Sequence, residues 1–213
     1  MPPGKFQPRD RAKFEAALRR FDQENSRDPN LEMADGAAQP RELIYAQWLT
    51  SWVSKLSPHA SEELRLAARC QHLCRWTIPR DRYPMTRAGY LRWRADLKKF
   101  HAQKSGEILH ELGFPEDLIA RVQALNLKSD FPRDEESRVL EDALCLVFLE
   151  HQFAALAEKT AEDKMLSAVQ KTWQKMTPAA RQIALGMTFG AREQALLQKA
   201  LEKLNKPPGP LPS

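Results

Sequence analysis

Apolar residues recur at helical spacing through almost the whole of this 213-residue chain. The pattern is densest at residues 143–149, seven consecutive apolar positions, so the helix around them should be central. Two-residue alternation rich in Val, Ile and Thr, which is typical of strands, is nearly absent. The sequence therefore predicts an all-α fold, a single-domain multi-helix bundle built around one central apolar helix.

Glycine, proline and capping residues divide this pattern into separate helices. Pro29, Gly36 and Pro40 predict a loop after the first helix, and Gly113 and Thr177 are expected to cap helix ends. We expect one domain over residues 1–204, followed by a disordered, proline-rich tail at 205–213. The expected helices cover residues 9–25, 40–56, 61–76, 90–112, 115–127, 137–158, 162–176 and 178–204.

The composition is that of an ordinary soluble globular protein, with 29% charged and 42% hydrophobic residues. No stretch reaches about 18 consecutive apolar residues, and the N-terminus lacks the apolar region of a secretory signal. We therefore expect a cytoplasmic protein that does not span a membrane. Cys70, Cys74 and Cys145 lack CxxC spacing, which favours buried thiols over a metal site and excludes a disulfide framework.

Positive charge is concentrated in one segment. Residues 75–104 contain nine Arg and Lys against only Asp81 and Asp96, a net charge of +7 in a chain whose total is +5. Such a concentration attracts a phosphorylated small molecule, nucleic acid or an acidic partner, although a solvated surface is an equal alternative. Tyr83, Tyr90 and Trp93 are interleaved with these charges and offer rings for stacking.

Three polar residues lie in or beside apolar helical segments: His72, His101 and Asp142. Burying an imidazole or a carboxylate costs free energy unless a partner or a metal compensates, so we expect them to converge on one site. Arg69 and Arg75 lie three residues either side of His72 and therefore share its helix face. The alternatives are a core histidine bonded to the backbone and, for Asp142, a structural helix cap.

The segment from His101 through HAQKSGEILHELGFPEDLIARVQAL to SRVLEDALCLVFLE resembles the second half of HD-superfamily domains, which are all-helical, metal-dependent phosphohydrolases. LAARCQHLCRW resembles the helix that carries their paired His and Asp, with His72 in the histidine place. The resemblance covers residues 40–155 and implies an HD-like core, in which His101 matches an auxiliary histidine and Asp142 the late metal-binding aspartate. Leu73 stands where the family has aspartate, and Glu42 stands roughly where it has its first histidine.

Nearly the full chain also resembles an uncharacterised, all-helical family of bacterial and fungal proteins known only as a domain of unknown function. The segments that carry this resemblance are NSRDPN, PRELIYAQ, AARCQHLCRW, IPRDRYP, GYLRWR, LEDALCLVFLE and KTWQKM. It implies a single domain and no particular mechanism.

Two main hypotheses follow. The first is an HD-like phosphohydrolase of a phosphorylated small molecule or nucleotide, with His72, Asp142 and Glu42 on a divalent metal ion and His101 as a second ligand or general acid. In it, the anionic group is held by Arg69, Arg75, Arg80 and Arg94. The second hypothesis is a non-catalytic module on a degenerate HD scaffold, which binds RNA or another polyanion through the basic segment. A helical scaffold for a partner protein is a third reading.

Overall fold

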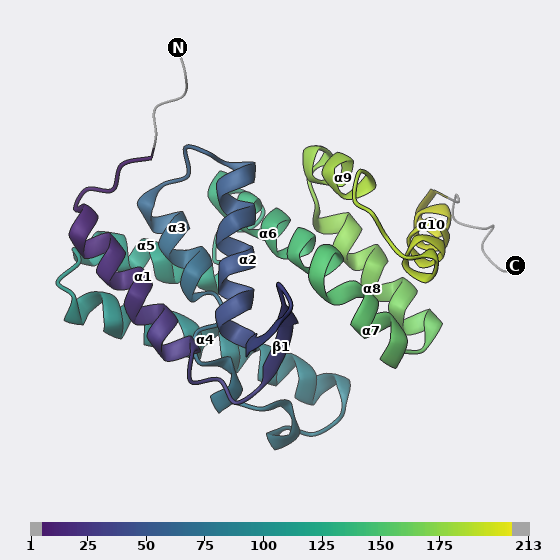
Figure 1. Cartoon of the computed structure of the whole chain (residues 1–213), viewed down its shortest axis with the longest axis horizontal. Helices are drawn as coiled ribbons and strands as arrows, with labels where there is room; N and C mark the ends of the chain where they lie inside the picture. Colours follow the sequence, from purple (N-terminus) through teal and green to yellow (C-terminus); the bar gives the residue numbers. More distant parts are fainter. Residues whose placement is uncertain (1–5, 206–213) are drawn as a thin grey trace, which may run out of the picture. The chain divides into compact units, whose positions relative to one another are not determined.

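The computed structural model describes residues 6–205 and confirms the all-α prediction. Within these residues the chain forms ten α-helices and one pair of short strands (Figure 1). The chain forms two compact units, Met1–Leu140 and Glu141–Ser213. No helix in the described part is long and apolar enough to cross a membrane.

The first unit is built around a short, largely buried helix. α3 (Glu62–Cys70) packs against α1, α2 and α5, and α4 packs against α5 and α1. Leu64, Leu66 and Ala67 on α3 are completely buried, which makes this helix the centre of the unit. The other elements are α1 (Arg11–Asn25), β1 (Leu31–Ala34), β2 (Ala37–Pro40), α2 (Arg41–Leu56), α4 (Arg87–Glu111), α5 (Glu116–Leu127) and the start of α6 (Glu135–Val147).

Helix ends in this unit follow from capping residues. The side chains of Asp10, Ser61 and Thr86 each accept a hydrogen bond from a backbone N–H in the first turn of α1, α3 and α4. Gly113 follows α4 with a φ of 73°, the left-handed conformation expected of a glycine after a helix. The helix predicted to reach Trp76 is shorter, because the chain turns after Cys70.

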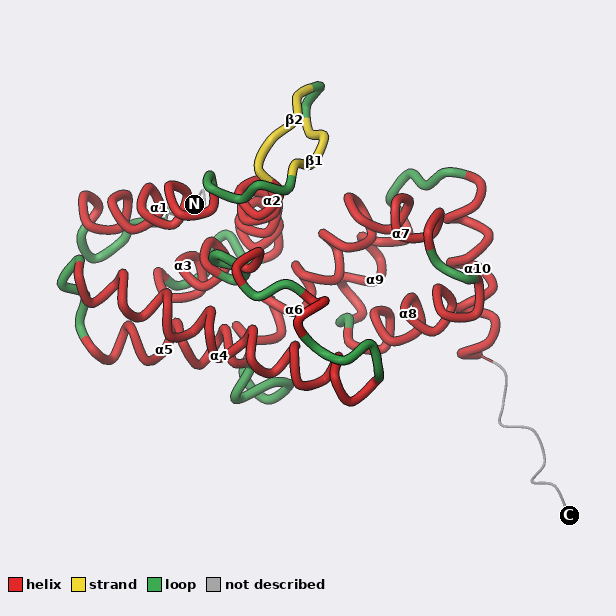
Figure 2. Tube along the Cα trace, turned by 90° about the horizontal axis from the view of Figure 1, so that it is seen from below, coloured by secondary structure: helices red, strands yellow, loops and turns green. Residues whose placement is uncertain are grey.

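The predicted loop around Gly36 is a β-hairpin, shown in yellow in Figure 2. β1 and β2 pair antiparallel, and the two residues between them, Asp35 and Gly36, have φ values of 51° and 78°. Positive φ at both positions is characteristic of a type I′ turn, for which Asp-Gly is a preferred sequence. Pro40 ends β2 and immediately precedes α2, so the hairpin leads directly into that helix.

The second unit contains the rest of α6 and the C-terminal helices. α10 (Ala191–Asn205) packs against α8 (Glu162–Lys175) and α7 (Phe153–Lys159), and a π-helical turn at Phe148–Gln152 separates α6 from α7. The single helix predicted at 178–204 is two helices, α9 (Pro178–Leu185) and α10, since the chain leaves helical conformation between Gly186 and Gly190. Thr177 caps α9 as predicted. Of the tail predicted at residues 205–213, residue 205 belongs to α10. Residues 206–213 lie outside the described residues.

Candidate functional site

Three of the predicted site residues meet in the first unit. The Glu42 carboxylate oxygen Oε2 lies 3.3 Å from Nδ1 of His72, and the ring centroids of His72 and His101 are 5.9 Å apart. Glu42 and His101 are buried, and the side chain of His72 is 15% exposed. Tyr45, one turn after Glu42, stacks on His72 with a centroid distance of 4.1 Å. We call Glu42, His72 and His101 together the Glu42–His72–His101 cluster.

Local structure explains how these side chains are positioned. The buried carboxylate of Asp28 accepts a hydrogen bond from the backbone N–H of Glu42, which fixes the start of α2. His72 lies in the turn that follows α3, where Cys74 has a φ of 55° and its backbone N–H donates to the side chain of Asn25. His101 comes from the middle of α4. The cluster therefore joins three separate elements.

Within residues 6–205, one ring nitrogen of His101 has no hydrogen-bond partner. Its Nδ1 lies 2.9 Å from the carbonyl oxygen of Leu73, and a carbonyl only accepts, so Nδ1 is the protonated nitrogen. Nε2 of the neutral ring then holds a lone pair, and this buried atom has no hydrogen-bond partner among the described residues. A buried lone pair of this kind is available to accept a hydrogen bond or a proton from a ligand.

Unsatisfied polar atoms gather around the turn after α3. Besides Nε2 of His101, they are Nδ2 of Asn25, Oε1 of Gln71 and Oδ1 of Asn126, all of them buried and without a partner in residues 6–205. Each of these side chains belongs to, or hydrogen-bonds to, residues 70–74. Because unsatisfied buried groups cost free energy, their concentration here is characteristic of a functional site.

Burial shifts the pKa values of the cluster residues so that their neutral forms are favoured. It lowers the pKa of His101 to about 3 and holds that of His72 well below its ordinary value. Burial raises the pKa of Glu42, while the positive charge of Arg75 acts in the opposite direction. The contact between Glu42 and His72 therefore joins a carboxyl group to a neutral imidazole and is not a simple ion pair.

Of the four predicted anion-binding arginines, Arg75 lies beside the cluster, and the charge of Arg94 also acts on it. Nη1 of Arg75 is 3.4 Å from Nδ1 of His72, and after burial the charges of Arg75 and Arg94 are the next largest causes of the lowered pKa of His72. Arg69 forms two 2.6 Å hydrogen bonds with Asp22 of α1. Arg80 donates to the backbone carbonyls of three nearby residues: Tyr83, Pro84 and Thr86. Arg69 and Arg80 thus have structural partners, whereas Arg75 and Arg94 act on the site.

Asp142 belongs to the second unit, where it acts as a helix-capping partner. Its buried carboxylate accepts hydrogen bonds from the backbone N–H and the hydroxyl of Thr177, and that hydroxyl in turn accepts from the N–H of Ala180 in α9. The three predicted metal ligands, Glu42, His72 and Asp142, are therefore divided between the two units.

The described residues do not form a metal site of the predicted kind. Within residues 6–205, no three or more His, Cys, Asp or Glu side chains are grouped so that they could hold an ion. Arg75 also places a guanidinium nitrogen within 3.5 Å of both nitrogens of His72, and that positive charge opposes a divalent cation at this ring. The thiols of Cys70 and Cys74 are buried and free, with pKa values raised by burial to about 11, as expected of inert cysteines.

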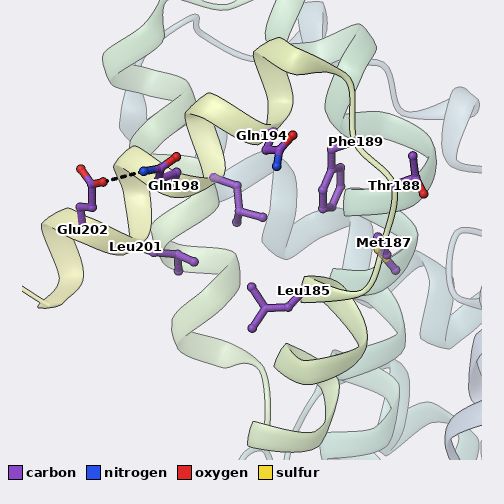
Figure 3. A pocket seen from close by; sticks show the side chains of 9 residues that line it. Leu185, Met187, Thr188, Phe189, Gln194, Gln198, Leu201 and Glu202 are labelled. Carbon is purple, nitrogen blue, oxygen red and sulfur yellow. Dashed lines mark hydrogen bonds between the residues drawn. The ribbon is translucent and has the colours of Figure 1, made fainter.

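A separate groove lies in the second unit, between the end of α9 and α10 (Figure 3). Its volume is about 550 Å³, and its lining is largely apolar, including Leu185, Met187 and Phe189. Among the described residues that line it, Glu202 is the one carboxylate, and it accepts a hydrogen bond from Gln198. The groove offers surface for an apolar ligand but lacks the paired titratable groups of the Glu42–His72–His101 cluster.

Together, the fold and the cluster define an all-α protein with a buried site of histidine, glutamate and arginine. Residues 15–197 match the family described as Domain of unknown function (DUF4202), and the chain belongs to that family. The expectation of an uncharacterised family is therefore confirmed, while the HD resemblance stays a prediction. Comparisons with curated proteins and with solved structures gave no match.

Proposed function

We propose that this protein binds a phosphorylated small molecule at the Glu42–His72–His101 cluster and hydrolyses it, with His101 as the proton acceptor. The observation that carries the proposal is the buried Nε2 of His101, which has no partner within the described chain and lies beside a second imidazole and a carboxyl group. Polar groups left unsatisfied in this way are characteristic of sites completed by a ligand.

The charge around the cluster favours an anion. Both imidazoles are neutral, and the guanidinium groups of Arg75 and Arg94 act on His72. Arginine suits phosphate because its planar fork matches two phosphate oxygens. A bound dianion would offset these positive charges and raise the pKa of His72, so binding should be accompanied by proton uptake on that ring, while His101 stays neutral and able to accept a proton.

The proposed reaction uses the groups of the cluster for proton transfer. Nε2 of His101 takes a proton from a water molecule, whose oxygen bonds to phosphorus while the bond from phosphorus to the leaving oxygen breaks. The carboxyl group of Glu42, whose pKa is raised by burial, supplies the proton that the leaving oxygen needs. Arg75 and Arg94 offset the negative charge that develops on the phosphoryl oxygens.

A divalent ion is the alternative implied by the HD resemblance: Glu42 and His72 would be among the residues that hold it, and it would lower the pKa of a water molecule. The reaction written above needs no such ion, and within residues 6–205 no three His, Cys, Asp or Glu side chains are grouped as ligands. An activity that depends on added zinc, manganese or magnesium, and that is abolished by a chelator, would support the metal-dependent alternative instead.

Calorimetry and phosphate release test the proposal directly. Nucleoside mono-, di- and triphosphates are titrated into the protein in two buffers of different ionisation enthalpy, and free phosphate is measured in parallel. We expect proton uptake on binding, and loss of phosphate release in His101→Asn, whose amide nitrogen can still donate to the carbonyl of Leu73. His59→Asn removes an exposed histidine as the matched control. The proposal would be refuted if none of these compounds bound or released phosphate. It would also be refuted if the two variants were equally active.

A further inference from the structure

The charge of Arg75 acts on all three residues of the Glu42–His72–His101 cluster. After burial, Arg75 is the largest cause of the shifted pKa values of Glu42 and His72, and it also contributes to that of His101. Within the described residues its guanidinium group pairs with no carboxylate, and its hydrogen-bond contact is with the ring of His72, 3.4 Å away. The protein therefore leaves this positive charge available for an anionic ligand.

The ring of Trp93 supports the guanidinium group of Arg75. Cζ of Arg75 lies 5.1 Å from the ring centroid, within the distance of about 6 Å over which a cation is attracted to a ring face. Trp93 is buried, and its Nε1 donates to the carbonyl oxygen of Ile78 over 2.9 Å. The backbone N–H of Arg75 donates to the carbonyl oxygen of His72 over 3.0 Å. Both ends of the Arg75 side chain are therefore held.

The helix that carries Trp93 also carries the proposed proton acceptor. Trp93 and His101 both belong to α4 and lie about two turns apart, and both are buried. The first turn of α4 is packed closely on the preceding loop, since Gly89 lies directly against the carbonyl of Pro84, where no Cβ fits. One helix thus places His101 directly and supports Arg75 through the ring of Trp93.

We propose that Trp93 is a positioning residue for anion binding, whose ring keeps the guanidinium group of Arg75 beside His72. This rests on the proposed function, which assigns Arg75 to the phosphoryl group. An arginine side chain loses rotamer freedom when it binds a ligand, and holding it in place beforehand lowers that cost. A purely structural Trp93 would contribute to stability, but its effect on binding would not depend on Arg75.

A double-mutant cycle with inorganic phosphate as the ligand tests this dependence. Affinity is measured by NMR titration at constant ionic strength. Arg75→Gln should bind phosphate at least about tenfold more weakly than wild type. Trp93→Leu should bind about fivefold more weakly, and Trp93→Phe, which keeps a ring but loses the N–H, should stay within about twofold of wild type. In the Arg75→Gln background, Trp93→Leu should cause no further loss, because the group that it positions is absent.

A matched control lies in the second unit, where Arg181 is 5.7 Å from the ring centroid of Trp173. Trp173→Leu removes a contact of the same kind and should leave phosphate binding unchanged. Should Trp93→Leu fail to fold, Trp93→Met takes its place in the cycle, since the flexible methionine side chain fills more of the space.

Three results would overturn the inference: no phosphate binding by wild type, equal weakening by Trp93→Leu in both backgrounds, or equal weakening by Trp173→Leu. The expected cycle in a protein that cleaves no phosphate ester would support the role of Trp93 and refute only the proposed hydrolysis.

Discussion

Replacing His101 with asparagine should make the stability of the first unit less sensitive to acid. The pKa of this buried histidine falls from the ordinary 6.5 to about 3 on folding, mainly because burial penalises the charged ring. Between these values the unfolded chain binds more protons than the folded one. The stability that neutral His101 contributes is therefore complete above pH 6.5 and is lost as the pH falls toward 3.

The two pKa values set the size of the effect. For a histidine titrating at 6.5 when unfolded and at about 3 when folded, lowering the pH from 7 to 5 removes about 2 kcal/mol from the free energy of unfolding. His72 adds a loss in the same direction, because its pKa is also lowered. Glu42 acts in the opposite direction, since its raised pKa favours the folded state at lower pH. Both groups are present in the variant, so the difference between the two proteins isolates His101.

Urea denaturation at pH 7 and pH 5 measures this difference. Tryptophan fluorescence is a suitable probe, because four of the five tryptophans lie in the first unit. Wild type should lose about 2 kcal/mol more than His101→Asn over this interval. His59→Asn should behave as wild type, since His59 is exposed. Parallel pH dependence of wild type and His101→Asn would show that His101 is not held neutral by burial, and the proton-accepting role would fail with it.

Three further predictions concern structural roles and metal content. Asp142→Ala should lose about 1–3 kcal/mol of stability, because Thr177 loses a buried acceptor, and should retain ligand binding; unchanged urea stability would contradict the capping role. Arg69→Lys should lose about 1 kcal/mol or more, because an ammonium group cannot reproduce both bonds to Asp22, and equal melting temperatures would contradict that reasoning. Elemental analysis of protein expressed in metal-replete medium should find no stoichiometric zinc or manganese; a bound ion would favour the metal-dependent mechanism.

The sequence predicts the helices well where a terminus is marked by a local signal. Thr177 and Gly113 begin and end helices as expected, because capping depends only on a few neighbouring residues. The hairpin turn at Asp35 and Gly36 carries an equally local signal, the Asp-Gly pair, but its short strands lack an alternating apolar pattern. The break at Gly186 was missed because helical periodicity continues on both sides of it.

Part of the candidate site is also predictable from the sequence. His72 and His101 come together, because each polar group placed among apolar residues requires a buried polar environment, and Glu42, expected only from the HD resemblance, lies with them. Tyr45 was missed, although its position one turn after Glu42 places it on the same helix face. Arg69 and Arg80 could not be told apart from Arg75, since their partners are a distant carboxylate and local backbone carbonyls that no spacing rule identifies.

Asp142 and His101 show why burial alone does not identify a functional residue. Both are polar, buried and set in apolar helices, so the sequence treats them alike. Thr177 satisfies both oxygens of Asp142, and the cost of burying that carboxylate is met by stabilising a helix start. Leu73 satisfies only one nitrogen of His101, and no other residue in the described part of the chain compensates the lone pair on the second. Folding alone does not offset that cost. A ligand would therefore add stability at His101, which is buried and unsatisfied, and not at Asp142, which is buried and satisfied.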